Sequence, residues 1–285
     1  MKFNLNTAEI HIPDNVSVSE ALARTTHLCI AAHQDDIEIM AAQPIIDTYQ
    51  RDDKWFTGVV VTNERGSPRK DIYAKYTDDE MRNVRFKEQR KAAEIGEYSA
   101  QVMLDYPSSA VKDGKNAMPV DDFIALIKAT NPDFIYTHNL EDKHATHVGV
   151  AVKVIEALRR LSGEYTPKKV YGCEVWRNLD WMSDEEKVFM DCSTQKNLQE
   201  ALLGVFDSQI SGGKRYDLAA MGRRLANATF FDSHAVDDAT DLSYAMDLTP
   251  LIENLDLDIK EYVKGFINRF AEDVEKQIEE VIREA

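Results

Sequence analysis

Cysteine is scarce in this sequence of 285 residues, and no two cysteines lie close together in the sequence. The three cysteines, Cys29, Cys173 and Cys192, are widely separated, odd in number and form no CxxC pair. A disulfide framework needs an even set of cysteines, and a zinc finger needs closely spaced pairs. The sequence therefore predicts neither of these, and it fits a reducing compartment.

Long apolar runs and positive charge are also lacking. No apolar run approaches the roughly 20 residues of a membrane-spanning helix, and the N-terminus turns polar within a few residues. Fifty acidic against 34 basic residues give a net charge of −16, which repels nucleic-acid phosphates and anionic lipids. We therefore expect a cytoplasmic protein with no nucleic-acid partner and no membrane insertion.

The glycine-rich fingerprint of a dinucleotide-binding fold is absent as well. A GxGxxG motif should follow the first strand of such a fold. In this chain His33-Gln34-Asp35-Asp36 stands there instead. A nucleotide-binding α/β module is thereby disfavoured.

What the sequence does contain is a regular alternation of apolar patterns. Short apolar runs typical of buried strands alternate with runs of helical periodicity. The strands are expected at 26–33, 55–61, 101–104, 133–137 and 169–176, and the helices at 37–46, 77–96, 120–129 and 144–160. This order predicts a Rossmann-like α/β fold, with a mainly parallel sheet covered by helices on both faces.

The last third of the chain has a different pattern. We expect residues 1–180 to form the α/β catalytic core with the metal site, and residues 181–285 to form a mostly helical part packed on it. Residues 194–230 look helical, and an apolar stripe runs from Ile259 to Ile278 at helical spacing. The stripe is expected to pack on its own domain, and a contact in a homo-oligomer is the alternative.

Two polar loops follow predicted strands, at the edge where open parallel sheets bind ligands. In the first, His33 and Asp36 lie three residues apart at a strand-to-helix turn and can converge on one metal ion. Asp35 lies between them and would project beside that point. It is thereby free for proton transfer.

The second loop contributes His144 and His147, which share a helical face by their spacing of three. One of them can bind the metal while the other acts in catalysis. Two histidines and one carboxylate leave a fourth tetrahedral position open to water, whereas structural zinc sites are closed by four protein ligands. We expect a catalytic Zn²⁺, with another divalent metal as the alternative.

Four segments, in this order, resemble the LmbE-like (PIG-L) family of zinc-dependent deacetylases. They are AAHQDDIEIM, GVVVTNERGSPRK, VRFKEQRKAAEIG and DKHATHVGVAV. The resemblance implies that His33, Asp36 and His147 bind zinc, that Asp35 is the general base, and that His144 stabilises or protonates the tetrahedral intermediate. It further implies a small-molecule N-acetyl amino sugar of the N-acetylglucosamine type as substrate, with release of acetate.

Three further residues are candidates for substrate binding. The resemblance implies that Arg85 holds sugar hydroxyls, and Asn63 belongs to the loop that matches the family's second-strand loop. Arg177 follows Trp176 after the fifth predicted strand, and amino-sugar sites often combine an aromatic ring with charged donors.

The chain departs from the family pattern at several positions. Gln34 replaces a proline, Thr146 an aspartate, Ala151 a glycine, and Asn63-Glu64 an Asp-Gly pair. Thr146 could still orient an imidazole through its hydroxyl.

Other interpretations stay open. His138 could replace one of the later histidines as a ligand. The alternatives to deacetylation are an amidase that cleaves a larger acyl group or a thiol conjugate, and a non-catalytic protein that binds zinc or sugar.

Overall fold

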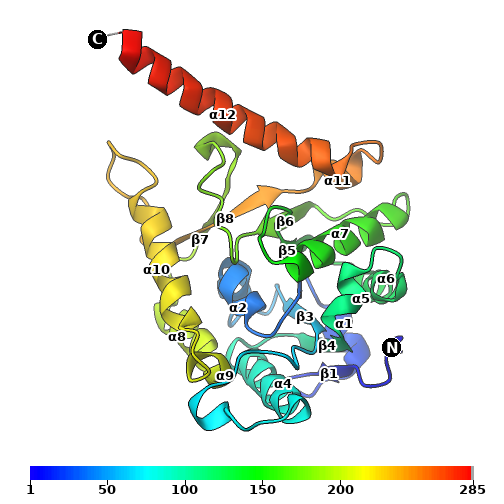
Figure 1. The fold of residues 1–285 in the computed structure, drawn as a ribbon. Helices are drawn as coiled ribbons and strands as arrows, with labels where there is room; N and C mark the ends of the chain where they lie inside the picture. The colour runs from blue at the N-terminus through cyan, green and yellow to red at the C-terminus, as the bar shows by residue number, and fades with distance from the viewer. Residues whose placement is uncertain (284–285) are drawn as a thin grey trace.

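The computed structural model describes residues 1–283, which form one eight-stranded sheet with helices on both faces (Figure 1). The strands are β1 (Glu9–His11), β2 (His27–Ala31), β3 (Phe56–Thr62), β4 (Ala100–Tyr106), β5 (Phe134–His138), β6 (Lys169–Cys173), β7 (Val188–Asp191) and β8 (Leu242–Asp247). Their order across the sheet is β1-β4-β3-β2-β5-β6-β8-β7. The five central strands are parallel, and β1, β8 and β7 pair antiparallel to their neighbours.

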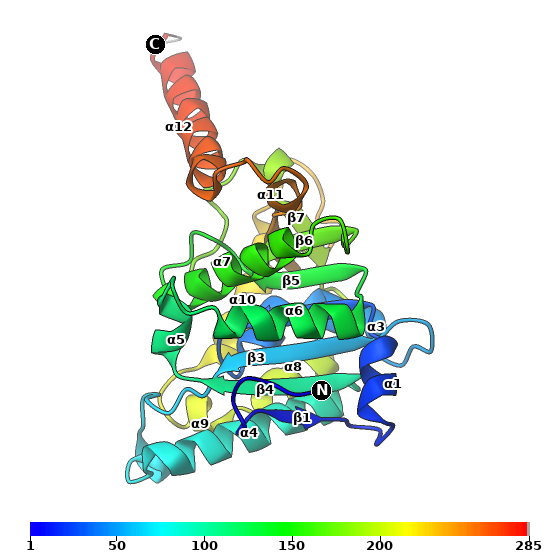
Figure 2. The same cartoon turned by 90° about the vertical axis from the view of Figure 1, so that its right-hand side faces the viewer.

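The helices are α1 (Val18–Ala23), α2 (Asp36–Met40), α3 (Ala42–Thr48), α4 (Asp78–Ile95), α5 (Ser108–Lys112), α6 (Met118–Thr130), α7 (Ala145–Arg160), α8 (Lys196–Gly204), α9 (Asp207–Ile210), α10 (Tyr216–Thr229), α11 (Pro250–Glu253) and α12 (Ile259–Arg283). Two short 3₁₀ helices, η1 (Asp71–Tyr73) and η2 (Asp184–Glu186), lie in loops. Figure 2 shows α5, α6 and α7 in front of the sheet, with α4, α8 and α10 behind it. Within residues 1–283 no helix combines the length and apolarity needed to cross a membrane.

The central strands are buried on both faces because their side chains alternate between two hydrophobic clusters. Leu28 and Ile30 of β2 pack with α6 and α7, whereas Cys29 and Ala31 pack with α2, α4 and α8. This explains why the strands appear in the sequence as continuous apolar runs. The α/β class predicted from the alternation of elements is confirmed.

Local sequence signals set several helix boundaries. Thr77 caps α4 and forms a capping box with Glu80, and the helix ends at Gly96, as the sequence predicts. The single helix expected over 37–46 is instead two short ones, because the backbone leaves the helical conformation at Ala41. Pro44 lies in the first turn of α3, where its missing N–H has no helical partner to lose.

The C-terminal part is less helical than expected. It contributes β8 and β7 to the sheet, and β8 pairs with β6 through Tyr171–Asp247, Gly172–Met246 and Cys173–Ala245. The series of strands therefore does not close at the fifth predicted strand. Residues 194–230 are helical as predicted, in α8, α9 and α10.

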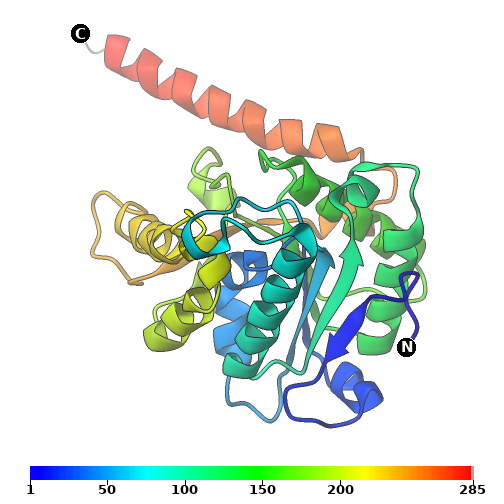
Figure 3. The same ribbon diagram turned by 60° about the horizontal axis from the view of Figure 1, so that its bottom comes forward.

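The terminal helix α12 leaves the body of the molecule, as Figures 1 and 3 both show. Only its first turns pack on the protein, through Ile259, Tyr262 and the buried Phe266. From residue 271 onward every described residue is exposed. The expected packing of the apolar stripe on its own domain thus holds only for the beginning of the helix.

Candidate metal centre

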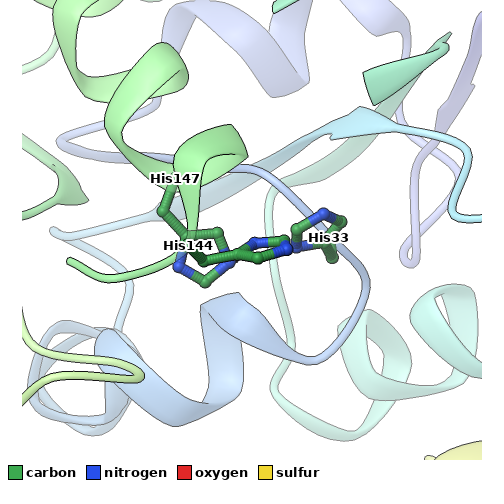
Figure 4. A group of neighbouring side chains, drawn as sticks. All are labelled: His33, His144 and His147. Atoms are coloured by element: carbon green, nitrogen blue, oxygen red, sulfur yellow. The ribbon is translucent and has the colours of Figure 1, made fainter. Parts of the chain in front are cut away.

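The candidate site lies at the carboxyl ends of β2 and β5. His33 follows β2, and Asp36 is the first residue of α2. His144 occupies the position just before the first residue of α7, and His147 is the third residue of this helix. Figure 4 shows the three histidines directed toward one another, with His33 reaching them from a different loop. The two polar loops that the sequence singles out are therefore brought together.

Three ligand atoms form a nearly equilateral triangle. The Nδ1 atom of His33 lies 3.1 Å from Oδ2 of Asp36 and 3.1 Å from Nε2 of His147, and the latter two atoms are 3.3 Å apart. In a tetrahedral zinc site with bonds of about 2.0–2.1 Å, neighbouring ligand atoms are separated by about 3.3–3.4 Å. The residues present therefore fit a divalent metal ion.

A second carboxylate lies behind His147. Oδ2 of Asp142 is 3.3 Å from Nδ1 of His147, while Nε2 faces Asp36. Such a partner favours the proton on Nδ1 and leaves the lone pair of Nε2 for a metal. Burial disfavours the charged imidazole, but Asp36 and Asp142 outweigh it and raise the pKa of His147 to about 10. The two carboxylates therefore favour a positive charge at His147.

Asp36 is the electrostatic centre of the group. Burial disfavours its charged form, yet the nearby His147, His138 and His33 together hold the pKa of Asp36 well below its usual range. Its Oδ2 also accepts a hydrogen bond of 2.8 Å from the backbone N–H of His33. The carboxylate is thus ionised and fixed in position.

His138 is the geometric alternative as a ligand, because Asp36, His138 and His147 also form a group that could hold a metal. Its Nε2 lies 3.5 Å from Oδ2 of Asp36. That nitrogen already accepts a hydrogen bond of 2.8 Å from the backbone N–H of Ala32, so coordination would break this bond. The ring stacks on His147 at 3.9 Å between centroids, which suits a supporting role.

His144 lies beside the triangle and is more accessible than the other histidines. Its ring centroid is 4.9 Å from that of His33 and 4.6 Å from that of His147. Burial, reinforced by these two neighbours, lowers the pKa of His144 to about 4. A neutral imidazole on the cavity wall can donate or accept a hydrogen bond at neutral pH. His144 also belongs, with His33 and His147, to a second group that could hold an ion.

Asp35 is held in an unusual backbone conformation. Its φ of 85° lies in the left-handed region, which costs a non-glycine residue about 1–3 kcal/mol. Its N–H donates to Oε1 of Gln89 (3.3 Å), and its side chain faces the cavity outside the ligand triangle. Burial raises the pKa of Asp35 well above its usual range, aided by Glu64 and Asp36 and opposed by Arg85.

Arg85 lies behind the site and does not reach its surface. Its side chain is fully buried, pairs with Glu64, donates to the carbonyl of Gln34 at 2.6 Å and lies 3.5 Å from Asp35. It lines neither of the two cavities that reach the histidines. The expected contact between Arg85 and sugar hydroxyls therefore does not match its position, and its charge acts on Asp35 instead.

The Asn63-Glu64 departure from the family pattern has a structural counterpart. Glu64 adopts a φ of 45°, a backbone conformation that favours glycine. The family pattern has a glycine at this position. Its carboxylate pairs with the buried Arg85. Asn63 donates from Nδ2 to the carbonyl of Asp105 at 3.1 Å and lines a cavity beside the centre.

A cavity of about 430 Å³ opens over the centre and is closed by the C-terminal part of the chain. The floor includes His33, Asp35 and Asp36, whereas Trp176 and Tyr216 stand on the wall with an edge-to-face contact of 5.9 Å between ring centroids. Other wall residues come from the segment before α10 and from α10 itself, namely Lys214, Ala219, Ala220, Arg223 and Arg224. Residues beyond 180, outside the predicted catalytic core, therefore form much of the wall of this cavity.

A second cavity of about 680 Å³ reaches the same centre from another side. It shares His33, His144, Glu64 and Pro68 with the first cavity. The loop that carries Glu64 and Pro68 therefore separates the two. His33 and His144 of the candidate metal centre line both cavities.

Glu174 is a cavity residue that the sequence analysis missed. It is 2% exposed and lines the first cavity, and its Oε2 has no hydrogen-bond partner among residues 1–283. Its other oxygen accepts from Nδ2 of Asn227 at 2.6 Å. The one sequence signal was an acidic residue directly after the apolar β6. Arg177, predicted to bind substrate, is exposed and lines neither of these two cavities.

One family model matches this part of the chain. Residues 28–158 match the family model described as PIG-L, GlcNAc-PI de-N-acetylase. No curated protein sequence matches the chain. The matched segment contains the whole histidine and aspartate cluster.

Solved structures with a similar fold have different activities. The hydratase GalB for 4-carboxy-2-hydroxymuconate, from Pseudomonas putida, has a TM-score of 0.58 and 17% identity, over 79% of this chain and 96% of its own. The N,N′-diacetylchitobiose deacetylase of Pyrococcus horikoshii has a TM-score of 0.59 and 13% identity, over 81% and 86%. The A40926 pseudoaglycone deacetylase Dbv21 has 0.57 and 13%, over 79% and 97%. At these identities the likeness shows the fold alone.

Proposed function

Because residues 28–158 form a PIG-L (LmbE-like) domain, we propose that this chain is a metal-dependent hydrolase that removes the acetyl group from an N-acetylated amino sugar. The products are acetate and a free amine. The observation that carries the proposal is the triangle of His33, Asp36 and His147 with the separate carboxylate of Asp35 beside it. Two of the three structures compared are described as deacetylases.

We assign the metal to His33, Asp36 and His147. Zinc in such a site supplies a Lewis acid for the amide carbonyl and lowers the pKa of water at the open position. Asp142 orients His147 from behind, and His138 supports its ring. This ligand set leaves His144 and Asp35 for the reaction itself.

Asp35 takes the proton from the attacking water. Its buried position raises its proton affinity above that of an ordinary carboxylate, which brings a general base closer to the working pH. The guanidinium of Arg85, 3.5 Å away, limits this effect and keeps the carboxylate ionisable. The left-handed backbone at Asp35 places the carboxylate outside the ligand triangle.

His144 acts on the carbonyl oxygen. Its ring stands beside those of His33 and His147 on the wall of the first cavity. From there its neutral imidazole donates a hydrogen bond to the developing oxyanion. The proton that Asp35 takes from the attacking water is passed to the departing nitrogen.

The sugar itself lies in the first cavity. Trp176 offers an aromatic face, and the unpartnered oxygen of Glu174 accepts a hydrogen bond from a sugar hydroxyl. An aromatic wall with a few convergent polar groups is the usual lining of a small-ligand site.

The proposal is tested by measuring bound metal and acetate release together. The protein is purified, its metal content is determined, and it is incubated with N-acetylglucosamine, its disaccharide, and its glycolipid and thiol-linked conjugates. At least one substrate should release acetate, and chelation should abolish the release. Metal binding without acetate from any of them would instead favour a non-catalytic binding protein.

The Asp35→Asn variant separates catalysis from metal binding. It should keep its metal and lose about 10²–10⁴-fold in acetate release, because general acid–base catalysis contributes about that factor. Asp47→Asn, at the opposite end of the sheet beside His27 and Lys54, serves as the matched control and should keep full activity. Unchanged acetate release by Asp35→Asn would exclude its role as the base.

A second candidate function is the cleavage of a larger acyl group, and the second cavity favours it. An acetyl group needs little space, yet this cavity of about 680 Å³ also reaches His33 and His144. A series of N-acyl glucosamines with increasing acyl length distinguishes the two functions. Deacetylation predicts the highest kcat/KM with acetyl, whereas the amidase predicts a rise with longer chains.

A further inference from the structure

One wall of the first cavity carries basic side chains, although the chain as a whole is strongly acidic. Fifty acidic and 34 basic residues give a net charge of −16, yet Lys214, Arg223 and Arg224 all line this one cavity of about 430 Å³. They come from α10 and from the segment directly before it. Basic side chains gathered on the wall of a cavity attract a ligand group of the opposite charge.

The carboxylates on the floor of the cavity are matched by other groups. Oδ2 of Asp36 faces the imidazoles of the metal centre, with Nε2 of His147 at 3.3 Å. Glu64 pairs with the buried Arg85, which also lies 3.5 Å from Asp35. The floor therefore does not need the basic side chains of the wall as counter-ions.

Arg224 serves the fold itself. Its buried guanidinium donates to the carbonyls of Glu38 (2.8 Å) and Ile39 (3.0 Å) near the end of α2, and to Oε1 of Gln199 (2.7 Å). These bonds fix α10 beside α2 (Figure 1), the helix that begins with Asp36. Arg224 therefore supports the wall and is not available to a ligand.

Lys214 and Arg223 are not engaged in this way. Both are half-buried, and neither forms an ion pair with a carboxylate within residues 1–283. Nζ of Lys214 lies 5.2 Å from the centroid of the Trp176 ring, and the guanidinium of Arg223 donates to the carbonyl of Val175. An aromatic ring or a carbonyl oxygen stabilises a cation without cancelling its charge. Both side chains therefore present a full positive charge to the cavity.

Glu174 is the cavity carboxylate whose charge Arg223 influences. Its Oε1 accepts from Nδ2 of Asn227 at 2.6 Å and from the backbone N–H of Tyr244 at 3.1 Å. Burial raises the pKa of Glu174, and the charge of Arg223 opposes this effect. Arg223 therefore acts on Glu174 at longer range, without a direct ion pair.

The beginning of α10 adds to the positive potential of the same wall. The helix starts at Tyr216, and both Tyr216 and Ala219 of its first turn line the cavity. The N-terminal end of a helix carries about half a positive charge. The acidic side chain of this turn, Asp217, pairs with Arg215. The ammonium of Lys214 and the helix end therefore reinforce each other.

We propose that the substrate is an acidic derivative of the N-acetylated amino sugar, and that Lys214 and Arg223 bind its carboxylate or phosphate group. The inference rests on the proposed function, because it places the acetamide at the metal centre and the rest of the substrate along the wall. A guanidinium matches two oxygens of a carboxylate or a phosphate, and an ammonium supplies a second charge. The two residues thus select the conjugate without taking part in the reaction.

Acetate release from charge-matched substrates tests the proposal. Three N-acetylglucosaminides that differ only at the end of the aglycone are compared, one with a carboxylate, one with a phosphate and one with a neutral carboxamide. An anionic member should exceed the carboxamide by about 10- to 100-fold in kcat/KM, the factor that a hydrogen bond between charged groups contributes. The better of the two anions identifies the natural group. Equal kcat/KM for all three would overturn the proposal.

Substitutions on the wall locate the preference. Lys214→Met and Arg223→Gln should each lower kcat/KM for the preferred anion far more than for the carboxamide, and Arg223→Lys should keep more of the preference than Arg223→Gln. Arg215→Gln is the matched control, because it removes a neighbouring charge that is exposed and lines neither cavity at the centre. An equal loss of preference in Arg215→Gln and Lys214→Met would attribute the effect to overall charge and contradict the assignment.

Binding of the deacetylated products separates this inference from the reaction. The three corresponding free amines are titrated calorimetrically into the wild type and into Lys214→Met. The wild type should bind the anionic amines more tightly than the neutral one, and high salt should reduce the difference because it screens the charges. This preference without acetate release would keep the anion site and reject the proposed reaction. Equal affinities together with acetate release would reject the anion site alone.

Discussion

The two ends of strand β2 carry histidines of similar burial in opposite surroundings. His27 begins the strand and His33 follows it, and they are 5% and 6% exposed. His27 stacks on Phe134 at 5.0 Å, and its nearest carboxylate, Asp47, is 3.7 Å away. His33 has two potential ligand atoms within 3.1 Å of its Nδ1. The convergence of polar atoms, and not the residue type, distinguishes the candidate metal centre from a core histidine.

Loss of a ligand at the carboxyl end should have the largest effect. His147→Ala removes one corner of the ligand triangle. Loss of a residue that only orients a ligand costs about 10–100-fold in metal affinity, so loss of the ligand itself should cost more than about 100-fold. Metal content after dialysis and acetate release should both fall.

His27→Gln is the matched control for that variant, because it removes a buried histidine from the other end of the same strand. It should retain full metal content. If His27→Gln lost metal as His147→Ala does, the contrast between the two ends would be wrong.

Removal of the carboxylate behind His147 should have an intermediate effect. Asp142 contacts Nδ1 of His147 and accepts hydrogen bonds from the N–H groups of His144 (2.8 Å) and Trp176 (3.0 Å). We expect Asp142→Asn to weaken metal binding by about 10–100-fold, measured by titration with a metal-selective chelator.

Thr146→Ala is the control for the Asp142 variant. In the sequence, Thr146 is a residue that could orient an imidazole, whereas in the structure Asp142 lies 3.3 Å from Nδ1 of His147. Thr146→Ala should therefore bind metal as the wild type does. A larger loss in Thr146→Ala than in Asp142→Asn would reverse the assignment.

The smallest effect is expected at His27, at the amino end of β2, and it is a change in the free energy of unfolding with pH. Burial lowers the pKa of His27 from 6.5 to about 4, against the opposing effect of Asp47. Below pH 6.5 the unfolded chain takes up a proton that the folded chain resists until about pH 4, so stability falls as the pH drops through this range. The slope is at most about 1.4 kcal/mol per pH unit.

The His27→Gln variant isolates this contribution. Between pH 6.5 and 4 its free energy of unfolding, measured with urea, should fall less steeply than that of the wild type. Parallel curves for the two proteins would show that His27 does not resist protonation.

Short-range patterns made the α/β core predictable, and they also indicated which residues would come together in the candidate metal centre. His33 and Asp36 are three residues apart, as are His144 and His147, and both pairs follow apolar strands. Local spacing therefore constrains their geometry. The position of Arg85 was not predictable in this way, because a charge-rich helix looks solvated in sequence, and only the fold shows that Glu64 and Asp35 neutralise a buried guanidinium.

Long-range pairing explains what the sequence did not reveal in the last third. β7 and β8 are short strands of four and six residues, and β8 finds its partner β6 some seventy residues earlier in the chain. The wall residues Trp176, Tyr216 and Arg223 converge only through this pairing and the packing of α10. The periodicity of apolar residues within a short stretch of sequence carries no information about contacts between segments that are far apart in the chain.

The place of β8 between β6 and β7 governs how the protein can be divided. A protein cut at residue 180 would leave the backbone N–H and C=O groups of β6 unpaired along an open edge, which invites aggregation. It would also lose Tyr216, Arg223 and Arg224 from the cavity wall. The histidine and aspartate cluster therefore cannot be transferred on its own, and engineering of this protein has to keep both parts of the chain together.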